Sequence, residues 1–495
     1  MKMKKIYLIG LVLALFVSGC ELTDNIDPKA APEVTADVLL TQALRDGLAL
    51  VDDMNQNRNV SRFLCQYSSQ MQYTDPSRYQ FSDRQIPDGY WDNSYLVLQD
   101  LNRIRTLIQD ISGSEELNNT IANKLAVVDI IEVLMYQNLV DFFGDIPYTE
   151  ALGGFDNKTP AYDDAETIYS DLQTRLGADI ATLTANAANG NWGSEDIVYG
   201  GDHGMWVKFA ATLKLRMGMR LADVDAATAQ AEVTAALAAG CLEPGESMQL
   251  SWPGVTPHVN TIYNVFVVAN RNDYAPSLTI IDLMEQLDDA RMPAYFTQVD
   301  TSALGEGKMA YVGLPYGEVA NNSYPSFSHF GSTMFAPDFP ATFACNAEVE
   351  FLLAEAAARG MTVDGGTAQE HYEAGIAESH AFWGVTMHGN YMTNVDVAWD
   401  DARAKELIGT QKWIALYNRG NEGYATWRCF DWPILDPPDD MTYADIPMRM
   451  PFPYNEPDLN GDNYTAAASA IGGDDVRTLL FWDETISTET PAAGF

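Results

Sequence analysis

Several segments of the chain repeat apolar residues at the spacing of one buried face of an α-helix. The first stripe comprises Val127, Ile130, Ile131 and Leu134. This i, i+3, i+4, i+7 pattern stops at Asp141–Pro147, where a glycine and then a proline end helices. Stripes of the same kind occupy 206–217, 349–356 and 372–383. The spacing therefore predicts a mainly α fold.

The last two stripes lie close together and predict a helical hairpin. The first ends at Arg359-Gly360 and the second at Gly384, with MTVDGGTAQE between them. Alanines at 354 and 356–358 let a neighbouring helix approach closely. The pair resembles a tetratricopeptide hairpin, although the full repeat consensus is absent. A scaffold of tetratricopeptide-like helical hairpins is expected, because such pairs bury their apolar stripes against one another.

Long stretches rich in Pro, Gly, Asn and aromatic residues interrupt these helices. They cover residues 66–90, 240–275, 297–343 and 431–475. Loops of this length inside a compact domain are uncommon and tend to be functional. The pattern predicts a loop-rich irregular subdomain beside the helices.

The amino terminus predicts export and lipidation. MKMKK is followed by IYLIGLVLALFV, an apolar run shorter than the roughly 20 residues that span a bilayer. It ends in V-S-G-C, which resembles the bacterial lipobox. We expect a signal peptide at 1–19, lipidation of Cys20, a polar tether at 20–35 and one domain at 36–495; the alternative is an incidental cysteine near the signal junction.

The remaining cysteines, Cys65, Cys241, Cys345 and Cys429, lie far apart without a C-x-x-C pair. A chain this long does not need disulfides to stabilise its core. Buried free thiols are expected, with one bridge as the alternative.

The charge balance limits the ligands. The chain has 69 acidic and 29 basic residues, a formal net charge of −40. Such a surface repels nucleic acid but accepts neutral ligands, cationic peptides and divalent cations. Nucleic-acid binding is excluded.

No catalytic motif is present in the sequence. The six histidines show no H-E-x-x-H spacing, and no G-x-S-x-G or phosphate-binding loop occurs. Paired carboxylates need only be close in space, so a glycan or peptide hydrolase stays an alternative. The acidic turn Asp458, Asn460, Asp462 has the spacing of a calcium loop, but Asn463 and Ser469 stand where an EF-hand needs glycine and glutamate. No cofactor is expected beyond a loosely bound calcium ion.

The aromatic loops are the candidate binding surface. Sugars present flat C–H faces that stack on aromatic rings, while their hydroxyls need polar partners. The candidate ligand-binding residues are Tyr73, Asp75, Arg78, Tyr79, Trp252, Tyr324, Phe327 and His329. The alternative is that most of these rings hold long loops on the core. Trp91 and Tyr95, at the start of an expected helix, are assigned to packing.

Several segments resemble the SusD/RagB-like outer-membrane lipoproteins of Bacteroidetes. They are DFFGDIPYTEA (141–151), FACNAEVEFLLAEAAARG (343–360), HYEAGIAESHAFWG (371–384), IGTQKWIALYNRGNEGYATWR (408–428) and IPMRMPFPYNE (446–456). The matches keep the family's order along most of the chain. Gly423 departs from the pattern, which often has alanine there.

The resemblance implies a surface lipoprotein that captures oligosaccharides or peptides above a SusC-like TonB-dependent β-barrel transporter in the outer membrane. Acidic residues after the lipidated cysteine (Glu21, Asp24 and Asp27) resemble a surface-export signal. The motifs fall on expected scaffold helices, so they transfer no ligand residue.

Three functions follow as hypotheses. A non-enzymatic nutrient-binding lipoprotein is the first, with the aromatic loops favouring oligosaccharide and the net charge leaving basic peptides open. A surface hydrolase and a transporter adaptor that binds no ligand are the alternatives.

Overall fold

The computed structural model describes residues 34–52, 57–81, 85–304, 307–318, 323–438, 445–484 and 491–495. The predicted signal peptide, Cys20 and the tether up to residue 33 lie outside these ranges. Among the described residues, no helix combines the length and apolar character that crossing a membrane requires.

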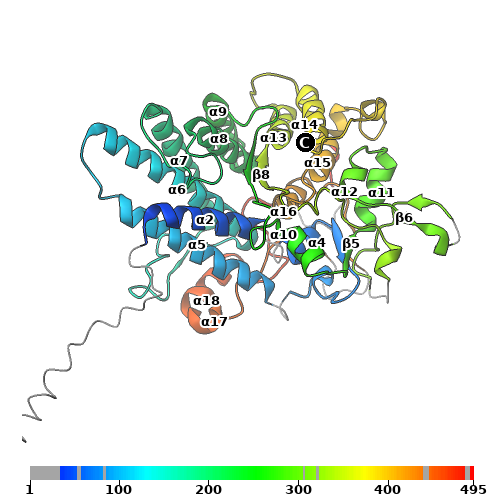
Figure 1. The fold of residues 1–495 in the computed structure, drawn as a ribbon, viewed down its shortest axis with the longest axis horizontal. Helices are drawn as coiled ribbons and strands as arrows, with labels where there is room; N and C mark the ends of the chain where they lie inside the picture. Colours follow the sequence, from blue (N-terminus) through cyan, green and yellow to red (C-terminus); the bar gives the residue numbers. More distant parts are fainter. Residues whose placement is uncertain are drawn as a thin grey trace, which may run out of the picture.

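Helices form the main part of the fold, as predicted (Figure 1). Each helix of an N-terminal series packs on the next. The series is α2 (Ala36–Val51), α5 (Ile86–Ile108), α6 (Glu115–Phe143), α7 (Ala165–Ala185), α8 (His203–Arg220) and α9 (Ala226–Ala239). A second group, α13 (Asn346–Ala358), α14 (Ala368–Phe382), α15 (Ala404–Ala415) and α16 (Gly420–Phe430), joins it through contacts of α13 with α8. The predicted hairpin is the packed pair α13 and α14.

Local sequence signals explain where these helices begin and end. The Ser114 side chain accepts a hydrogen bond from the backbone N–H of Leu117 and caps α6. Thr367 and Glu370 form a capping box at the start of α14. The predicted stops carry glycines at positive φ, 81° at Gly144 and 66° at Gly384. The predicted ends are confirmed.

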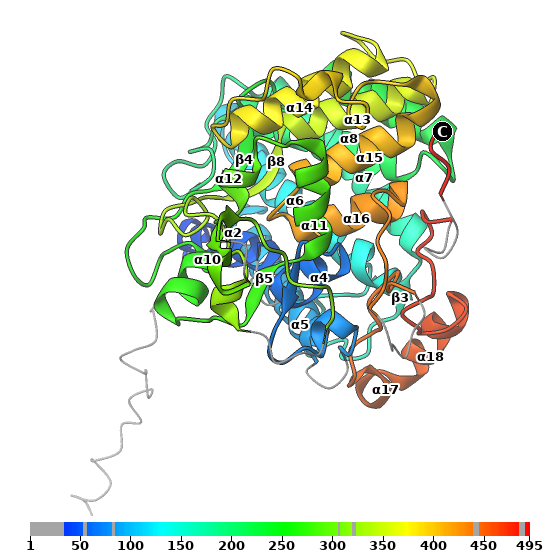
Figure 2. The same ribbon diagram turned by 90° about the vertical axis from the view of Figure 1, so that its right-hand side faces the viewer.

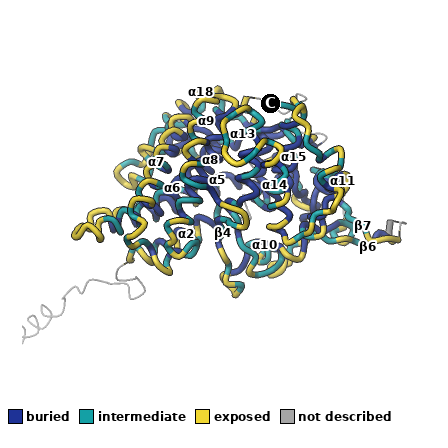
Figure 3. Tube along the Cα trace, turned by 90° about the horizontal axis from the view of Figure 1, so that it is seen from above, coloured by how far each residue is buried: buried dark blue, intermediate teal, exposed yellow. Residues whose placement is uncertain are grey.

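The described strands form short two-stranded ribbons, and all but the β2–β3 pair involve the loop-rich part (Figure 2). The pairs are β1 (Ser68–Gln70) with β5 (Tyr274–Pro276), β4 (Ser247–Leu250) with β8 (Ala341–Cys345), β6 (Val299–Asp300) with β7 (Met309–Ala310), and β2 (Ile146–Pro147) with β3 (Tyr162–Asp163). The short helices of this part are α4 (Arg62–Leu64), α10 (Thr261–Tyr263), the π-helix η4 (Asn264–Val268), α11 (Leu278–Leu287) and α12 (Met292–Tyr295). One buried cluster includes residues of both parts, such as Leu44 and Phe296, so they share a core (Figure 3).

Two predicted loop ranges contain more helix than the sequence pattern indicated. Helix α5 starts inside the first range, at Ile86. The last range contains α17 (Glu456–Leu459) and α18 (Gly461–Ala470). Asn, Asp and Gly around residue 460 suggested a loop, but the following TAAASA is rich in alanine, the strongest helix former. Its helix buries only Ala467, so no apolar stripe revealed it.

Three of the segments that carry the family resemblance are distant in sequence and meet in the core. The guanidinium of Arg428 donates 2.8 Å hydrogen bonds to the carbonyls of Met448 and Asp141. Nearby, Nη2 of Arg449 donates to the carbonyl of Phe143 at 2.8 Å. These arginines satisfy the carbonyls at the end of α6, which have no partner within the helix. The motifs are therefore scaffold contacts.

The four described cysteines are free thiols, so the disulfide alternative is wrong for them. Cys65 and Cys241 are buried, whereas Cys345 and Cys429 are partly exposed as whole residues. Burial raises the pKa of the Cys241 thiol to about 12.

Packing against Tyr67 explains why position 423 is glycine, where the family pattern often has alanine. A Cβ at this position would lie 2.6 Å from the hydroxyl oxygen of Tyr67 and 2.9 Å from its Cε2. We expect Gly423→Ala to lower the free energy of unfolding by about 1–3 kcal/mol, because the core has no room for the methyl group. Chemical denaturation measures the loss. In a Tyr67→Phe background the same substitution should cost less, and equal costs in the two backgrounds would refute the explanation.

The protonation of Asp179, in α7, makes the stability of the folded protein decrease as the pH rises. Burial, and then the charge of Asp129, raises the pKa of Asp179 to about 10. An unfolded aspartate has a pKa of about 3.9, so between these values the folded chain binds a proton that the unfolded chain has lost, and stability falls with increasing pH. Asp179→Asn should therefore stabilise the protein at pH 8 by about 1–2 kcal/mol and by less at pH 5.

Thermal denaturation at the two pH values tests this expectation. Asp129→Asn is the matched control, because the Asp129 carboxylate pairs with Arg105 and Arg175 at 2.8 Å. That substitution should destabilise the protein. A gain from Asp179→Asn that is the same at both pH values would contradict the titration argument.

Candidate functional site

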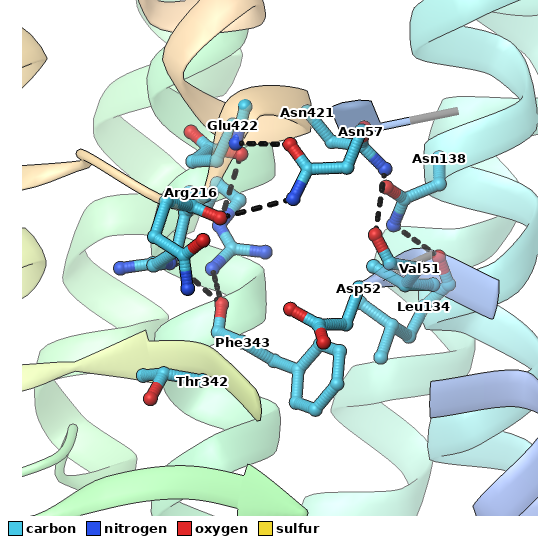
Figure 4. Close-up of a pocket in the computed structure, with 13 residues that line it drawn as sticks. Val51, Asp52, Asn57, Leu134, Asn138, Arg216, Thr342, Phe343, Asn421 and Glu422 are labelled. Carbon is cyan, nitrogen blue, oxygen red and sulfur yellow. Dashed lines mark hydrogen bonds and ion pairs between the residues drawn. The ribbon is translucent and has the colours of Figure 1, made fainter. Parts of the chain in front are cut away.

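A polar pocket lies between α8 and the start of α16 (Figure 4). Asn57 spans it, accepting from the backbone N–H of Gly420 and donating to the carbonyl of Asn418, each at 3.0 Å. Asn421 donates to the carbonyl of Val51 at 3.1 Å. The cavity volume is about 30 Å³, room for about two water molecules. A pocket of this size does not admit a sugar ring.

Buried charges beside this pocket join three helices. Glu348 of α13 accepts from Nε of Arg216 at 2.6 Å and also pairs with Arg419. Burial alone would raise the pKa of Glu348, but the two guanidiniums hold it well below its usual value. A second pair joins Arg220 and Glu422 at 2.7 Å. Both glutamates belong to family-like motifs, so these motifs hold the scaffold together.

The candidate binding surface begins at one end of the β1–β5 ribbon. Gln70 pairs with Tyr274 in the antiparallel register, and the N–H of Met71 donates to the carbonyl of Asp273 at 2.9 Å. The loop after β1 and the loop before β5 therefore leave the ribbon at the same end. Residues 311–318 and 323–330 lie alongside, because Leu314 bridges to Ser277 and Tyr324 and Phe327 pack on a cluster that includes Ala275.

Aromatic side chains of residues 323–330 cover the ribbon. Phe327 and Tyr324 pack against a small buried cluster of Met71, Ala275 and Leu314. The Tyr324 ring stacks on His329 with centroids 3.8 Å apart and an interplanar angle of 5°. Burial lowers the pKa of His329, so the imidazole is neutral at pH 7.

An ion pair lies next to these rings. Arg271 donates from Nε to Asp273 at 2.8 Å and from Nη2 at 2.5 Å, a bidentate arrangement. The guanidinium carbon also lies 5.5 Å from the ring centroid of Tyr274. Hydrogen bonding to Asp273, followed by the nearby charges of Tyr274, Asp273 and Tyr73, raises the pKa of Arg271.

Tyr73 is the most exposed of the aromatic residues here. Its side chain is 66% exposed, and its φ of 58° lies in the left-handed region that non-glycine residues rarely occupy. We call Tyr73, Arg271, Asp273, Tyr324, Phe327 and His329 the aromatic loop surface. It offers rings for stacking and the partly exposed guanidinium of Arg271 for hydrogen bonds, while the buried Asp273 holds that guanidinium in place. Rings with a few placed polar groups are the composition of a small-molecule site.

The predicted binding residues divide into three groups. Tyr73, Tyr324, Phe327 and His329 come together on the aromatic loop surface. Asp75, Arg78 and Tyr79 lie in the same loop but build it. The carbonyl of Asp75 accepts from the N–H of Gln80 at 2.9 Å, and Arg78 donates to the carbonyl of Gly317 at the same distance.

Tyr79 and Trp252 pack in or against the main hydrophobic core. Tyr79 is 2% exposed and packs against Tyr316, so it presents no ring to solvent. Trp252 lies in the loop after β4 and is partly buried against the main hydrophobic core. Its indole nitrogen is buried and finds no hydrogen-bond partner in the described part of the chain.

The sequence search missed Arg271 and Asp273. Their i, i+2 spacing directly before Tyr274, inside a loop already singled out, was a usable signal. Trp91 packs in the core as expected, at 5% exposure, and Tyr95 donates from its hydroxyl to the carbonyl of Pro147 at 2.6 Å.

The local structure of the acidic turn around residue 460 differs from that of a calcium-binding loop. Asp458 lies in α17, Asp462 in α18, and Asn460 connects the two helices. The Asn460 amide donates to the carbonyl of Pro160, and its oxygen accepts from Asn463. Within the described ranges, no group of three His, Cys, Asp or Glu side chains is arranged to hold a metal ion.

The chain is similar to known proteins in both sequence and fold. Residues 28–453 match the model of the SusD-like family described as "Starch-binding associating with outer membrane". A chitin-binding SusD homologue from Flavobacterium johnsoniae superposes with a TM-score of 0.77 at 24% identity, covering 90% of this chain and 99% of that one.

Two further solved structures give the same result. A SusD homologue from Bacteroides uniformis has a TM-score of 0.77 at 25% identity, with coverage of 90% and 99%. A SusD-like protein from Bacteroides thetaiotaomicron has 0.77 at 23% identity with the same coverage. A search of curated proteins finds no match. With the family model matching most of its length, this chain belongs to the SusD-like family.

Proposed function

We propose that the protein is a non-enzymatic lipoprotein that binds oligosaccharide on the aromatic loop surface. The observation that carries the proposal is the stacked pair of Tyr324 and His329 beside the bidentate Arg271–Asp273 pair. A ring face binds the C–H face of a sugar, and the partly exposed Arg271 guanidinium, which Asp273 holds in place, binds its hydroxyls. The family's description as starch-binding and the chitin-binding relative support a glycan as the ligand.

The chemistry of this surface suits binding better than catalysis. Arg271 donates a hydrogen bond to each oxygen of the Asp273 carboxylate, so both oxygens already have a partner within the protein. His329 directs Nε2 toward the carbonyl of Tyr324 at 3.2 Å, which occupies that nitrogen. General acid–base catalysis needs a group that is free to exchange a proton with the substrate. Their hydrogen-bonding atoms are therefore engaged within the protein and are not placed to act as a general acid or base.

The proposed setting is the cell surface. Cys20 would carry the lipid, residues 21–35 would form a tether, and a SusC-like TonB-dependent transporter would receive the ligand. Several buried acyl chains anchor a protein stably in a membrane. Labelling with radioactive palmitate tests the anchor, and co-purification of a β-barrel from detergent-solubilised membranes tests the partner.

Calorimetric titration of residues 21–495 tests the ligand class. One pool contains neutral oligosaccharides from plant, host and microbial sources, and the other contains a mixed peptide digest. We expect heat from one glycan class. Heat from peptides alone would replace the glycan by a peptide and give the negative surface a role in recognition. No heat from either pool would reject ligand binding and favour an adaptor.

A further inference from the structure

A second concave site lies away from the aromatic loop surface, between α5, the 147–160 segment and α17. Its volume is about 410 Å³, within the range typical of small-molecule sites and far above the pocket of Figure 4. We call it the α5–α17 groove. In Figure 1, α17 and α18 lie below α5, whereas β5 and β6 lie to the right.

The walls of the groove are apolar and aromatic. Trp91 and Tyr95 of α5 form one side, with ring centroids 5.3 Å apart. The hydrogen bond from the Tyr95 hydroxyl to Pro147 fixes that ring. Leu96 and Leu459 line the rim and are 64% and 68% exposed. Leucines with this exposure beside a cavity leave apolar area that a ligand can cover.

A few polar groups face the same space. Asp92 and Glu456 contribute carboxylates, and Lys158 contributes an ammonium group. Partial burial, and then the charge of Asp88 one turn earlier, raises the pKa of Asp92. One oxygen of Glu456 accepts from the hydroxyl of Tyr162 at 2.5 Å, which orients the carboxylate. The groove thus has hydrogen-bond acceptors and a donor around an apolar wall.

This combination selects the ligand's charge. Asp92 and Glu456 repel an anion, and Lys158 opposes a lysine or arginine guest. A neutral polyhydroxylated ligand uses all three groups, because each hydroxyl both donates and accepts. Its C–H faces can cover Tyr95 and the two leucines. We propose that the α5–α17 groove is a second binding site for neutral sugar units, independent of the aromatic loop surface. Its ligand class rests on the proposed function.

The test is hydrogen–deuterium exchange with chitohexaose, and with maltohexaose in parallel, on the chain from residue 21 onward. Three variants accompany the wild type: Tyr324→Ala on the aromatic loop surface, Leu459→Arg in the groove, and Val38→Arg on α2. Leu459 and Val38 are similarly exposed, at 68% and 62%, so Val38→Arg controls for adding a charge to an exposed apolar position.

Protection of residues 147–160 and 456–464 by one of the sugars is expected in the wild type, in Tyr324→Ala and in Val38→Arg. In Leu459→Arg, the sugar-induced protection of residues 147–160 and 456–464 should fall by at least 80%, while residues 323–330 stay protected. Protection of 323–330 alone would reject the groove and keep the proposed function. Groove protection that survives Leu459→Arg, or that a lysine-rich peptide produces instead of a sugar, would overturn the inference. No protection anywhere would reject both proposals for these sugars.

Discussion

Replacing Glu348 by alanine is expected to lower the free energy of unfolding by about 3–5 kcal/mol, the cost of removing one partner from a buried ion pair. The Glu348 side chain is 0% exposed, and Arg216 is 3% exposed. Without the carboxylate, the positive charges of Arg216 and Arg419 repel each other. Their guanidinium N–H groups also lose the Glu348 oxygens, which accept their hydrogen bonds in place of water. Arg216 would keep its 2.6 Å hydrogen bond to the carbonyl of Phe343 and a 3.5 Å ion pair with Glu422, a carboxylate that it shares with Arg220.

Urea denaturation followed by circular dichroism measures this loss. Glu285→Ala on α11 is the matched control, since Glu285 is exposed, and its removal should change stability by no more than about 0.5 kcal/mol. Equal losses for the two variants would show that the Glu348 network contributes nothing specific.

The same network predicts sensitivity to acid. The pKa of Glu348 is lowered in the folded chain because Arg216 and Arg419 outweigh the effect of burial. An unfolded glutamate titrates at about 4.3. The contribution of Glu348 is therefore complete above that pH and is lost as the pH falls below it.

The scaffold could be predicted because its signals are local. The stripe at 127–134 and the glycine after Phe143 lie within one helix and its cap, so periodicity alone located both. The partners of Glu348 are different, because Arg216 is 132 residues away and Arg419 is 71 residues away. No periodic pattern connects residues at such separations, although the motif resemblance correctly placed Glu348 on the scaffold.

The aromatic loop surface was only partly predictable for the same reason. Composition identified the loops, but the pairing of β1 with β5 decides which side chains meet, and these strands are about 200 residues apart. Tyr73 and Tyr79 look alike in the sequence, yet one is 66% and the other 2% exposed. An aromatic residue in a long loop serves the core or the ligand according to tertiary packing.

Tyr324→Ala is expected to weaken oligosaccharide binding by about ten- to thirtyfold, or about 1.4–2 kcal/mol, the range of an aromatic residue that anchors a ligand. Removal of the ring takes away a stacking face and also frees His329, whose imidazole lies 3.8 Å from it between centroids. The loss should appear in calorimetric titration as a weaker dissociation constant. Unfolding is not expected, because the Tyr324 side chain is only partly buried.

Tyr324→Phe separates stacking from hydrogen bonding. It keeps the ring and removes only the hydroxyl, so it should retain affinity within about threefold if stacking dominates. Tyr73→Ala provides a second measure, because Tyr73 is exposed and lies beside Arg271 on the opposite loop. If both alanine variants bind as tightly as the wild type, these rings hold loops and do not contact ligand. A large loss in Tyr324→Phe as well would instead assign the binding energy to the hydroxyl, and the surface would then recognise its ligand by hydrogen bonds more than by ring contact.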